Sequence, residues 1–166
     1  SHRNWNSHHS KMTPSSYKKD ILNSIPRSVP REYLDSYFNS FFNSLPELEN
    51  LVSSADEILD VGCGAGFLVN YLSLKGYNIE GFDNYLYNPH TRAINKSINS
   101  ANKVQNCDIA NFQTDKRYDV IFLHNVVEHL DNWKDSVEHL NCILNPGGKI
   151  IFLLPNYSFP VECHFM

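Results

Sequence analysis

The fold is decided by one stretch of the chain, which reads Glu57-Ile58-Leu59-Asp60-Val61-Gly62-Cys63-Gly64-Ala65-Gly66-Phe67. Its first half is an apolar run with an acid near its end, which is typical of a buried parallel strand. Its second half has glycine at three alternate positions and then enters a helical pattern. Glycine permits a tight turn with positive φ, and its bare backbone lets a ligand approach the N–H groups of the following helix. The stretch therefore predicts a strand, a ligand-binding turn and a helix.

The glycine spacing separates two classes of ligand. A dinucleotide-binding turn follows the pattern G-x-G-x-x-G, which would require glycine at position 67, where this chain has Phe67. The observed pattern is G-x-G-x-G, with Asp60 two residues before the first glycine. This pattern resembles motif I of the class I S-adenosylmethionine-dependent methyltransferases, and the resemblance extends over residues 56–157. It implies S-adenosyl-L-methionine as the cofactor and disfavours a nicotinamide oxidoreductase.

Acids at two later strand ends extend the resemblance. Residues 77–83 predict the second strand, whose last residue, Asp83, lies about twenty residues past the glycines, where an acid can accept from ribose hydroxyls. Residues 103–109 predict the third strand, and the pair Asp108-Ile109 is similar to the family's adenine-binding pair. An acid at a strand end can also be merely solvated. The resemblance implies cofactor-binding roles for Asp60, Gly62, Cys63, Gly64, Gly66, Asp83, Asn84, Asp108, Ile109, His124 and Asn125.

The candidate catalytic residues follow the fourth strand. Residues 118–130 predict this strand and a loop containing Glu128-His129-Leu130, which resembles motif IV of the small-molecule methyltransferases. A hydroxyl acceptor usually needs a base or a metal to remove its proton. The predicted catalytic residues are His129, Glu128 and His164. His129 could instead pack a loop, and the same side chains could bind a divalent metal, although no metal is assigned.

The remaining core elements complete a fold prediction. Helices are expected over residues 68–74, ended by Gly76, over 89–101 and over 133–144. The turn at residues 145–148 (Asn-Pro-Gly-Gly) precedes a fifth strand at 149–156. Strands alternating with helices predict an α/β fold with a doubly wound, mostly parallel sheet, the Rossmann-like methyltransferase fold. The family's sheet usually has two further strands, so this sheet is expected to be truncated after strand five.

The N-terminal region is predicted to have two parts. Residues 1–29 are expected to form a flexible basic arm, because residues 1–31 contain six Lys or Arg against Asp20 alone. The predicted methyltransferase domain, residues 30–166, has N-terminal helices at 30–54 and a core at 55–157. Pro46 is expected to end the first of these helices. Its apolar stripe could pack on the sheet edge or form a lid, and consists of Tyr33, Leu34, Tyr37, Phe38, Phe41 and Phe42.

Composition limits the function classes. The apolar runs are far shorter than the ~20 residues that span a bilayer. The four cysteines form no C-x-x-C pair, which favours a reducing, cytoplasmic setting. Residues 32–166 carry a net negative charge, so a nucleic acid partner is disfavoured. The oligomeric state is left open.

Together with these observations, the family resemblance implies an S-adenosylmethionine-dependent methyltransferase that transfers a methyl group to a hydroxyl of a small molecule. One alternative is a metal-dependent RNA ribose methyltransferase. Another is a non-catalytic module that binds S-adenosylmethionine.

Overall fold

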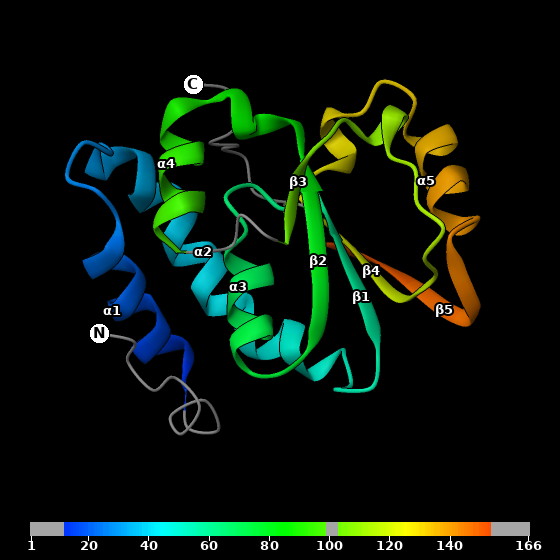
Figure 1. Cartoon of the computed structure of the whole chain (residues 1–166), viewed down its shortest axis with the longest axis horizontal. Coiled ribbons are helices and arrows are strands. Elements are labelled where there is room, and N and C mark those ends of the chain that lie inside the picture. The colour runs from blue at the N-terminus through cyan, green and yellow to red at the C-terminus, as the bar shows by residue number, and fades with distance from the viewer. Residues whose placement is uncertain (1–11, 99–102, 154–166) are drawn as a thin grey trace, which may run out of the picture.

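One parallel sheet organises the computed structural model of the chain, which describes residues 12–98 and 103–153 (Figure 1). The sheet has the strand order β3-β2-β1-β4-β5, and each neighbouring pair is parallel. The strands are β1 (Glu57–Val61), β2 (Asn78–Asp83), β3 (Val104–Asn106), β4 (Tyr118–His124) and β5 (Leu144–Leu153). This order confirms the predicted α/β doubly wound fold. The strand order reverses between β1 and β4, which is where ligands bind in such sheets.

Helices cover both faces of the sheet unequally (Figure 1). Helices α1, α2, α3 and α4 lie on one side, and α5 lies on the other. The helices are α1 (Pro14–Ser24), α2 (Arg31–Asn50), α3 (Phe67–Leu74), α4 (Pro89–Ser97) and α5 (Trp133–Asn141). Short 3₁₀ helices follow three of the strands: η3 (Asn84–Tyr87), η4 (Ile109–Asn111) and η5 (Val127–His129). No helix in the described part of the chain is both long and apolar enough to cross a membrane.

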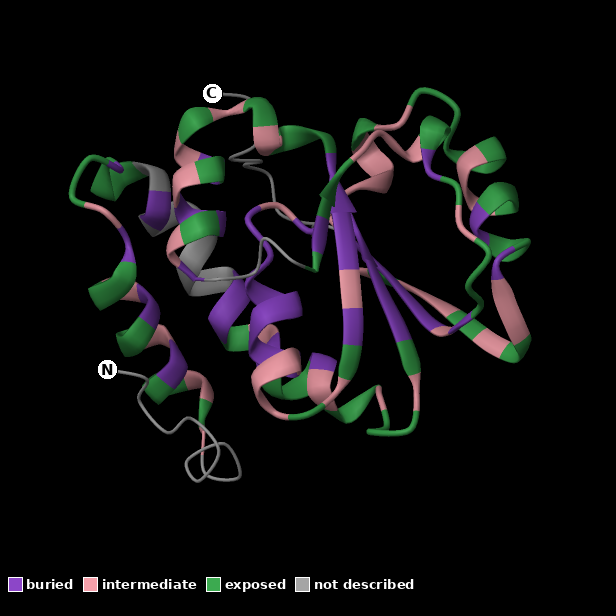
Figure 2. Ribbon diagram, in the orientation of Figure 1, coloured by how far each residue is buried: buried purple, intermediate pink, exposed green. Residues whose placement is uncertain are grey.

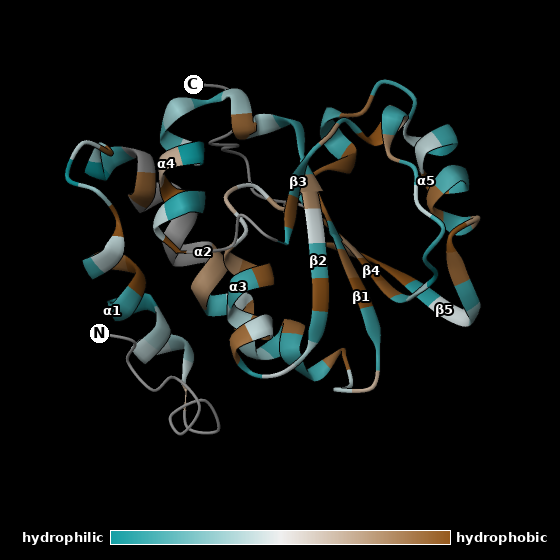
Figure 3. Cartoon of the chain, in the orientation of Figure 1, coloured by the Kyte–Doolittle hydropathy of each residue, from teal (hydrophilic) through white to brown (hydrophobic). Residues whose placement is uncertain are grey.

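The central strands are buried on both faces (Figure 2). In β1, Ile58 joins the larger hydrophobic cluster beneath α1–α4, whereas its neighbour Leu59 joins the cluster on the α5 side. In β4, Phe122 and Ile121 divide in the same way. Because successive side chains of a strand point to opposite faces, burial of both faces requires the continuous apolar runs seen in the sequence (Figure 3).

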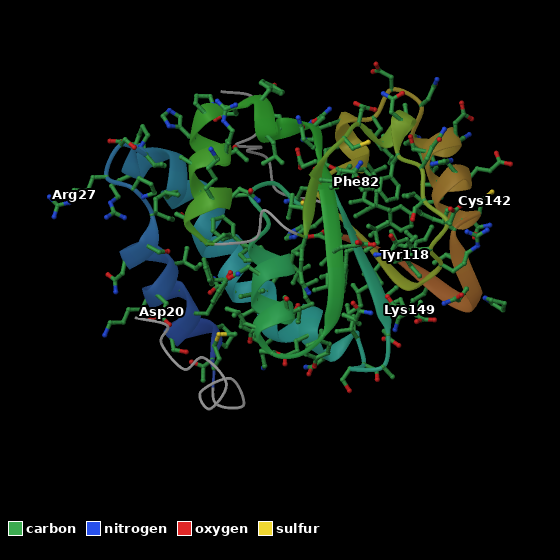
Figure 4. All side chains as sticks on the ribbon, viewed as in Figure 1. Asp20, Arg27, Phe82, Tyr118, Cys142 and Lys149 are labelled. Carbon is green, nitrogen blue, oxygen red and sulfur yellow. The ribbon has the colours of Figure 1, made fainter. Side chains whose placement is uncertain are left out.

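The cluster on the α5 side has a buried inner surface and an exposed outer one. Phe82 and Tyr118 belong to it and are almost fully buried, and the Phe82 ring stacks on Phe112 with a centroid distance of 4.1 Å. Figure 4 shows Cys142 and Lys149 at the outer side of this region, and both are exposed. The α5 side is therefore a thin layer over the sheet.

The prediction of a flexible arm is wrong for residues 14–24, which form α1. Thr13 and Ser16 form a capping box around the first turn, and Pro14 occupies the start of the helix, where it costs no hydrogen bond. Tyr17 and Ile21, four residues apart, are buried against the main cluster. The charged side chains of this segment favour the prediction of a flexible arm. The helix forms because its two apolar residues, Tyr17 and Ile21, pack against the core. Residues 1–11 lie outside the described part.

The prediction that Pro46 ends a helix is also wrong, because α2 continues through it to Asn50. Proline inside a helix costs about 3 kcal/mol through a lost hydrogen bond and a clash with the preceding turn. Leu45 and Leu48, on either side of it, are fully buried, and each contributes about 2 kcal/mol by leaving water. Of the predicted apolar stripe, Leu34, Phe41 and Phe42 are buried, and the other three side chains lie outside the described part.

The last helix and strand differ slightly from the prediction. Helix α5 ends at Asn141, and β5 begins at Leu144 instead of residue 149. Tyr118 pairs with Leu144 while Val120 pairs with Lys149, so the predicted turn forms an irregularity within the strand. Gly147 has φ +78° there, which suits glycine. Similarly, α4 ends at Ser97, earlier than residue 101. Residues 154–156 of the predicted fifth strand lie outside the described part.

Candidate functional site

The carboxyl ends of four strands bring the predicted cofactor residues to one edge of the sheet. The glycine turn follows β1, Asp83 ends β2, Asp108 follows β3 and His124 ends β4. These ends are adjacent because the strands are parallel and neighbouring. The predicted residues thus converge although they are spread over more than sixty positions of the sequence.

The glycine turn adopts a conformation that other residues would strain. Gly62, Gly64 and Gly66 have φ values of +70°, +57° and +89°. The Gly62 and Cys63 N–H groups both donate to the Phe82 carbonyl, at 2.9 and 3.2 Å. A Cβ atom on Gly62 would lie 2.3 Å from Cγ2 of Val126. Glycine is therefore required at position 62 both for its backbone conformation and for the space it leaves.

Asp83 joins the glycine turn to the end of β2. It is 8% exposed, and its Oδ2 accepts from the Gly64 N–H at 2.8 Å. Its Oδ1 accepts from the Tyr85 N–H at 2.5 Å. Each carboxylate oxygen can accept more than one hydrogen bond, so both retain capacity for a ligand hydroxyl. The residue predicted to bind ribose thus also fixes the turn in front of it.

Asp60 and Cys63 are both buried near Asp83, and both have raised pKa values. Burial, and then the nearby charge of Asp83, raise the pKa of Asp60 to about 8. Burial and the two aspartates also raise the pKa of the Cys63 thiol well above its ordinary value. At neutral pH Asp60 is largely protonated, so it can donate as well as accept a hydrogen bond.

The ends of β2 and β3 are linked by side chains predicted to bind the cofactor. Asn84 donates through Nδ2 to Oδ2 of Asp108 at 3.0 Å. Oδ1 of Asp108 accepts from the Ala110 N–H at 2.9 Å and starts η4. Ile109 is half-buried and packs against the α5-side cluster. Asn84, Asp108 and Ile109 thus occupy one small region beside Asp83.

The end of β4 combines an aromatic contact with a strained backbone. His124 stacks on Phe41 of α2, with ring centroids 6.4 Å apart. Burial lowers the pKa of His124, and the charge of Glu128 partly opposes this. Asn125 has φ +54° and donates its N–H to the Leu153 carbonyl at 2.8 Å. Non-glycine residues in this region of φ are uncommon and cluster at functional sites.

The two adjacent catalytic candidates lie in different environments on η5. Both carboxylate oxygens of Glu128 are buried, and within the described residues no donor reaches either one. The side chain of His129 is exposed, and its backbone N–H donates to the Val126 carbonyl. His164 lies outside the described part. Across residues 12–98 and 103–153, no three His, Cys, Asp or Glu side chains gather as a metal-binding group.

A cavity of about 230 Å³ lies away from this edge and is not the candidate site. It includes Glu80, which lies in the middle of β2 on the α5 side. The Glu80 carboxylate pairs with Lys116 at 2.8 Å and accepts from the Tyr118 hydroxyl at 2.6 Å. Its charge is therefore already balanced within the protein.

Sequence reasoning missed three buried polar residues next to the glycine turn, namely Tyr17, Asn70 and Asn95. The spacing of Tyr17 and Ile21 gave a signal for α1. A buried asparagine gives no such signal, because its partners come from distant segments.

A doubly wound parallel sheet with a glycine turn after β1 and an acid at the end of β2 defines the class of Rossmann-like cofactor-binding domains. A family model described as "Methyltransferase domain" matches residues 30–165. The chain belongs to this family, the class I S-adenosylmethionine-dependent methyltransferases.

Individual relatives match over part of their length. A ubiquinone biosynthesis O-methyltransferase of Rickettsia felis is 34% identical over 97 residues, which cover 57% of this chain and 39% of the relative. An uncharacterized protein of Mycobacterium tuberculosis is 33% identical over 116 residues, covering 65% and 39%. The chain thus spans about two fifths of the length of these relatives.

Solved structures share the fold at low sequence identity. The N-methyltransferase NodS of Bradyrhizobium japonicum, in complex with S-adenosyl-L-homocysteine, has a TM-score of 0.58 at 18% identity, covering 82% of this chain and 71% of NodS. Coclaurine N-methyltransferase, bound to N-methylheliamine and S-adenosyl-L-homocysteine, has a TM-score of 0.57 at 17% identity, covering 84% and 50%.

Proposed function

We propose that this chain binds S-adenosylmethionine and forms part of a methyltransferase that acts on a hydroxyl of a small molecule. The observation that carries the proposal is the hydrogen bond between Asp83 and Gly64. It sets a strand-end acid directly against a glycine turn, as a cofactor with a ribose and a charged tail requires. Membership of the methyltransferase family supports the same conclusion.

The residues at the carboxyl edge fit this cofactor. We assign the ribose hydroxyls to Asp83, and the adenine to Asp108, Ile109 and Asn84. The remaining contacts are assigned to the glycine turn with Asp60 and Cys63, and to His124 and Asn125 at the end of β4. When bound, the cofactor supplies an electrophilic methyl group. The protein's part is to align the acceptor and exclude water.

Glu128 is the proposed base. A buried carboxylate without a donor can accept a proton from an acceptor hydroxyl. His129 and His164 remain proposed catalytic residues. The name of the Rickettsia felis relative supports oxygen as the methyl acceptor.

Calorimetric titration with S-adenosylmethionine and S-adenosylhomocysteine tests the cofactor assignment. Asp83→Ala leaves the ribose hydroxyls and the Gly64 N–H without their acceptor, so we expect a loss of about 1–3 kcal/mol in binding. The matched control is Asp135→Ala, an exposed acid in α5, which should bind as wild type does. Failure of the wild-type chain to bind either compound would contradict the proposal.

Activity assays separate the possible acceptors. Turnover of a phenolic or sugar hydroxyl without added metal would support the proposed acceptor class. Turnover confined to RNA with divalent metal would instead favour the ribose methyltransferase. Binding without any turnover would favour a non-catalytic module.

A further inference from the structure

Two buried asparagines link helix α4 to the glycine turn and to helix α3. Asn95 of α4 donates through Nδ2 to the Ala65 carbonyl within the turn, at 3.1 Å. Asn70 of α3 donates through Nδ2 to the Ile98 carbonyl at the end of α4, at 2.8 Å. Both side chains are at most 9% exposed. Helices α3 and α4 lie on the same side of the sheet (Figure 1), and one of these bonds joins α4 to α3 while the other joins α4 to the glycine turn.

Tyr17 of α1 completes this arrangement. Its hydroxyl lies 2.7 Å from Oδ1 of Asn70 and 3.0 Å from the carbonyl of Phe67, the first residue of α3. The single hydroxyl proton is within reach of both acceptors. The Tyr17 ring is 2% exposed and packs at a centroid distance of 5.1 Å from Tyr71. A hydroxyl from the N-terminal helix therefore holds the first turn of α3.

The first turn of α3 and the glycine turn are one continuous backbone. Gly66 precedes Phe67 directly, and the Asn70 N–H donates to the Gly66 carbonyl at 2.8 Å. A displacement of α3 along its axis would thus be transmitted to the turn that faces the ligand. Binding of a ligand by backbone groups depends on their being held in place before the ligand arrives.

We infer that Tyr17 is a positioning residue for the cofactor site, acting through Asn70 and the first turn of α3. The inference rests on the proposed cofactor. If Tyr17 served only to fill the core, phenylalanine would fill the same space. Burying the hydroxyl costs free energy unless hydrogen-bond partners compensate for its removal from water. Here those partners are the residues that carry the glycine turn.

The test compares two Tyr→Phe variants of the 166-residue chain. Tyr17→Phe removes only the hydroxyl and keeps the ring. Tyr71→Phe is the matched control, because Tyr71 is fully buried in the same helix region but its hydroxyl donates to Oε2 of Glu49, at 3.1 Å. For each variant, the Kd for S-adenosylhomocysteine and the free energy of unfolding are measured at a temperature where all variants are folded.

The two variants should have different affinities for S-adenosylhomocysteine but similar free energies of unfolding. Both should be less stable than wild type. Tyr17→Phe should raise the Kd about fivefold, as expected for one buried hydrogen bond, while Tyr71→Phe should leave it within about twofold of wild type. Equal Kd values for both variants would overturn the inference and leave Tyr17 a stabilising residue only.

A double-mutant cycle identifies the route. In an Asn70→Ala background, Tyr17→Phe should change the Kd by a smaller factor than it does in wild type, because the hydroxyl then keeps only the Phe67 carbonyl as acceptor. Undiminished loss in that background would contradict the route through Asn70. If Asn70→Ala does not fold, the comparison of the two tyrosines decides alone. If the wild-type chain binds no S-adenosylhomocysteine, both the cofactor proposal and this inference are overturned. If the wild-type chain binds it but the two tyrosine variants have equal Kd values, only this inference is overturned.

Discussion

The two halves of the carboxyl edge are built differently. On the β1–β3 side, Asp83 accepts two backbone N–H groups and the Phe82 carbonyl accepts two more. On the β4–β5 side, Glu128 has no donor within the described residues, and no residue of β5 is buried. The backbone of the first half is therefore fixed by hydrogen bonds within the protein, before any ligand binds. The second contains one buried carboxylate that has no partner among the described residues, and this supports the proposal that the methyl acceptor binds there.

The difference follows from how deeply each half is buried. The glycine turn and the end of β2 lie among buried residues, and Cys63, Ala65, Phe67 and Asp83 are at most 8% exposed. In contrast, no residue of η5 is buried. Substitutions in the glycine turn and at Asp83 should therefore cost stability, whereas substitutions in η5 should change function with little cost in stability.

The largest effect is expected at Gly62. Gly62→Ala places a methyl group 2.3 Å from Val126 in a backbone conformation with φ +70°, so the free energy of unfolding should fall by about 3–5 kcal/mol. Gly76→Ala is the control, because its φ is +91° but a Cβ would meet nothing within 4 Å. It should cost only about 1–2 kcal/mol. Equal losses in denaturant titrations would show that the contact with Val126 is unimportant.

The second effect concerns pH and Asp60. Its pKa is about 8 in the folded protein against 3.8 for the unperturbed side chain, so the folded state holds the extra proton between these values. The stability contributed by this protonation is complete below about pH 4 and is lost as pH rises toward 8. We expect wild type to lose about 2–4 kcal/mol more than Asp60→Asn between pH 5 and pH 8. Parallel pH profiles of the two proteins would contradict this.

The smallest effect on stability is expected at Glu128. Glu128→Gln removes a buried charge that has no donor among the described residues, so stability should rise by up to about 1 kcal/mol. Affinity for S-adenosylhomocysteine should stay unchanged, while turnover falls about 100-fold if Glu128 is the base. The control is Glu138→Gln, an exposed position in α5. A loss of stability at Glu128 would show that its carboxylate has a structural partner.

Much of the fold follows from local sequence signals. The run from Ile58 to Val61 predicts a strand buried on both faces, and the glycines after it predict a turn that only glycine fits. Asp83 ends β2 and Asp108 follows β3, at the strand ends that the sequence pattern predicts. The edge where they meet follows from parallel topology alone.

Other features depend on contacts between distant segments, and local signals misjudged them. Helix α2 continues through Pro46 because Leu45 and Leu48 are buried against the sheet side, which no local pattern reveals. Helix α1 rests on Tyr17 and Ile21 within a charged segment. The different environments of Glu128 and His129 arise from how η5 packs, although the two residues are adjacent in the sequence.

The hydrogen bonds around the glycine turn also imply an order of folding. The bond between Asp83 and Gly64 joins residues 19 positions apart, whereas the bond between Tyr17 and Asn70 joins residues 53 apart. Closing the longer loop costs more chain entropy and is rewarded only once α3 exists as a docking surface. The β1-turn-α3-β2 unit should therefore form early and α1 should dock late. In a chain emerging from the ribosome, α1 would stay undocked until α3 has been synthesised.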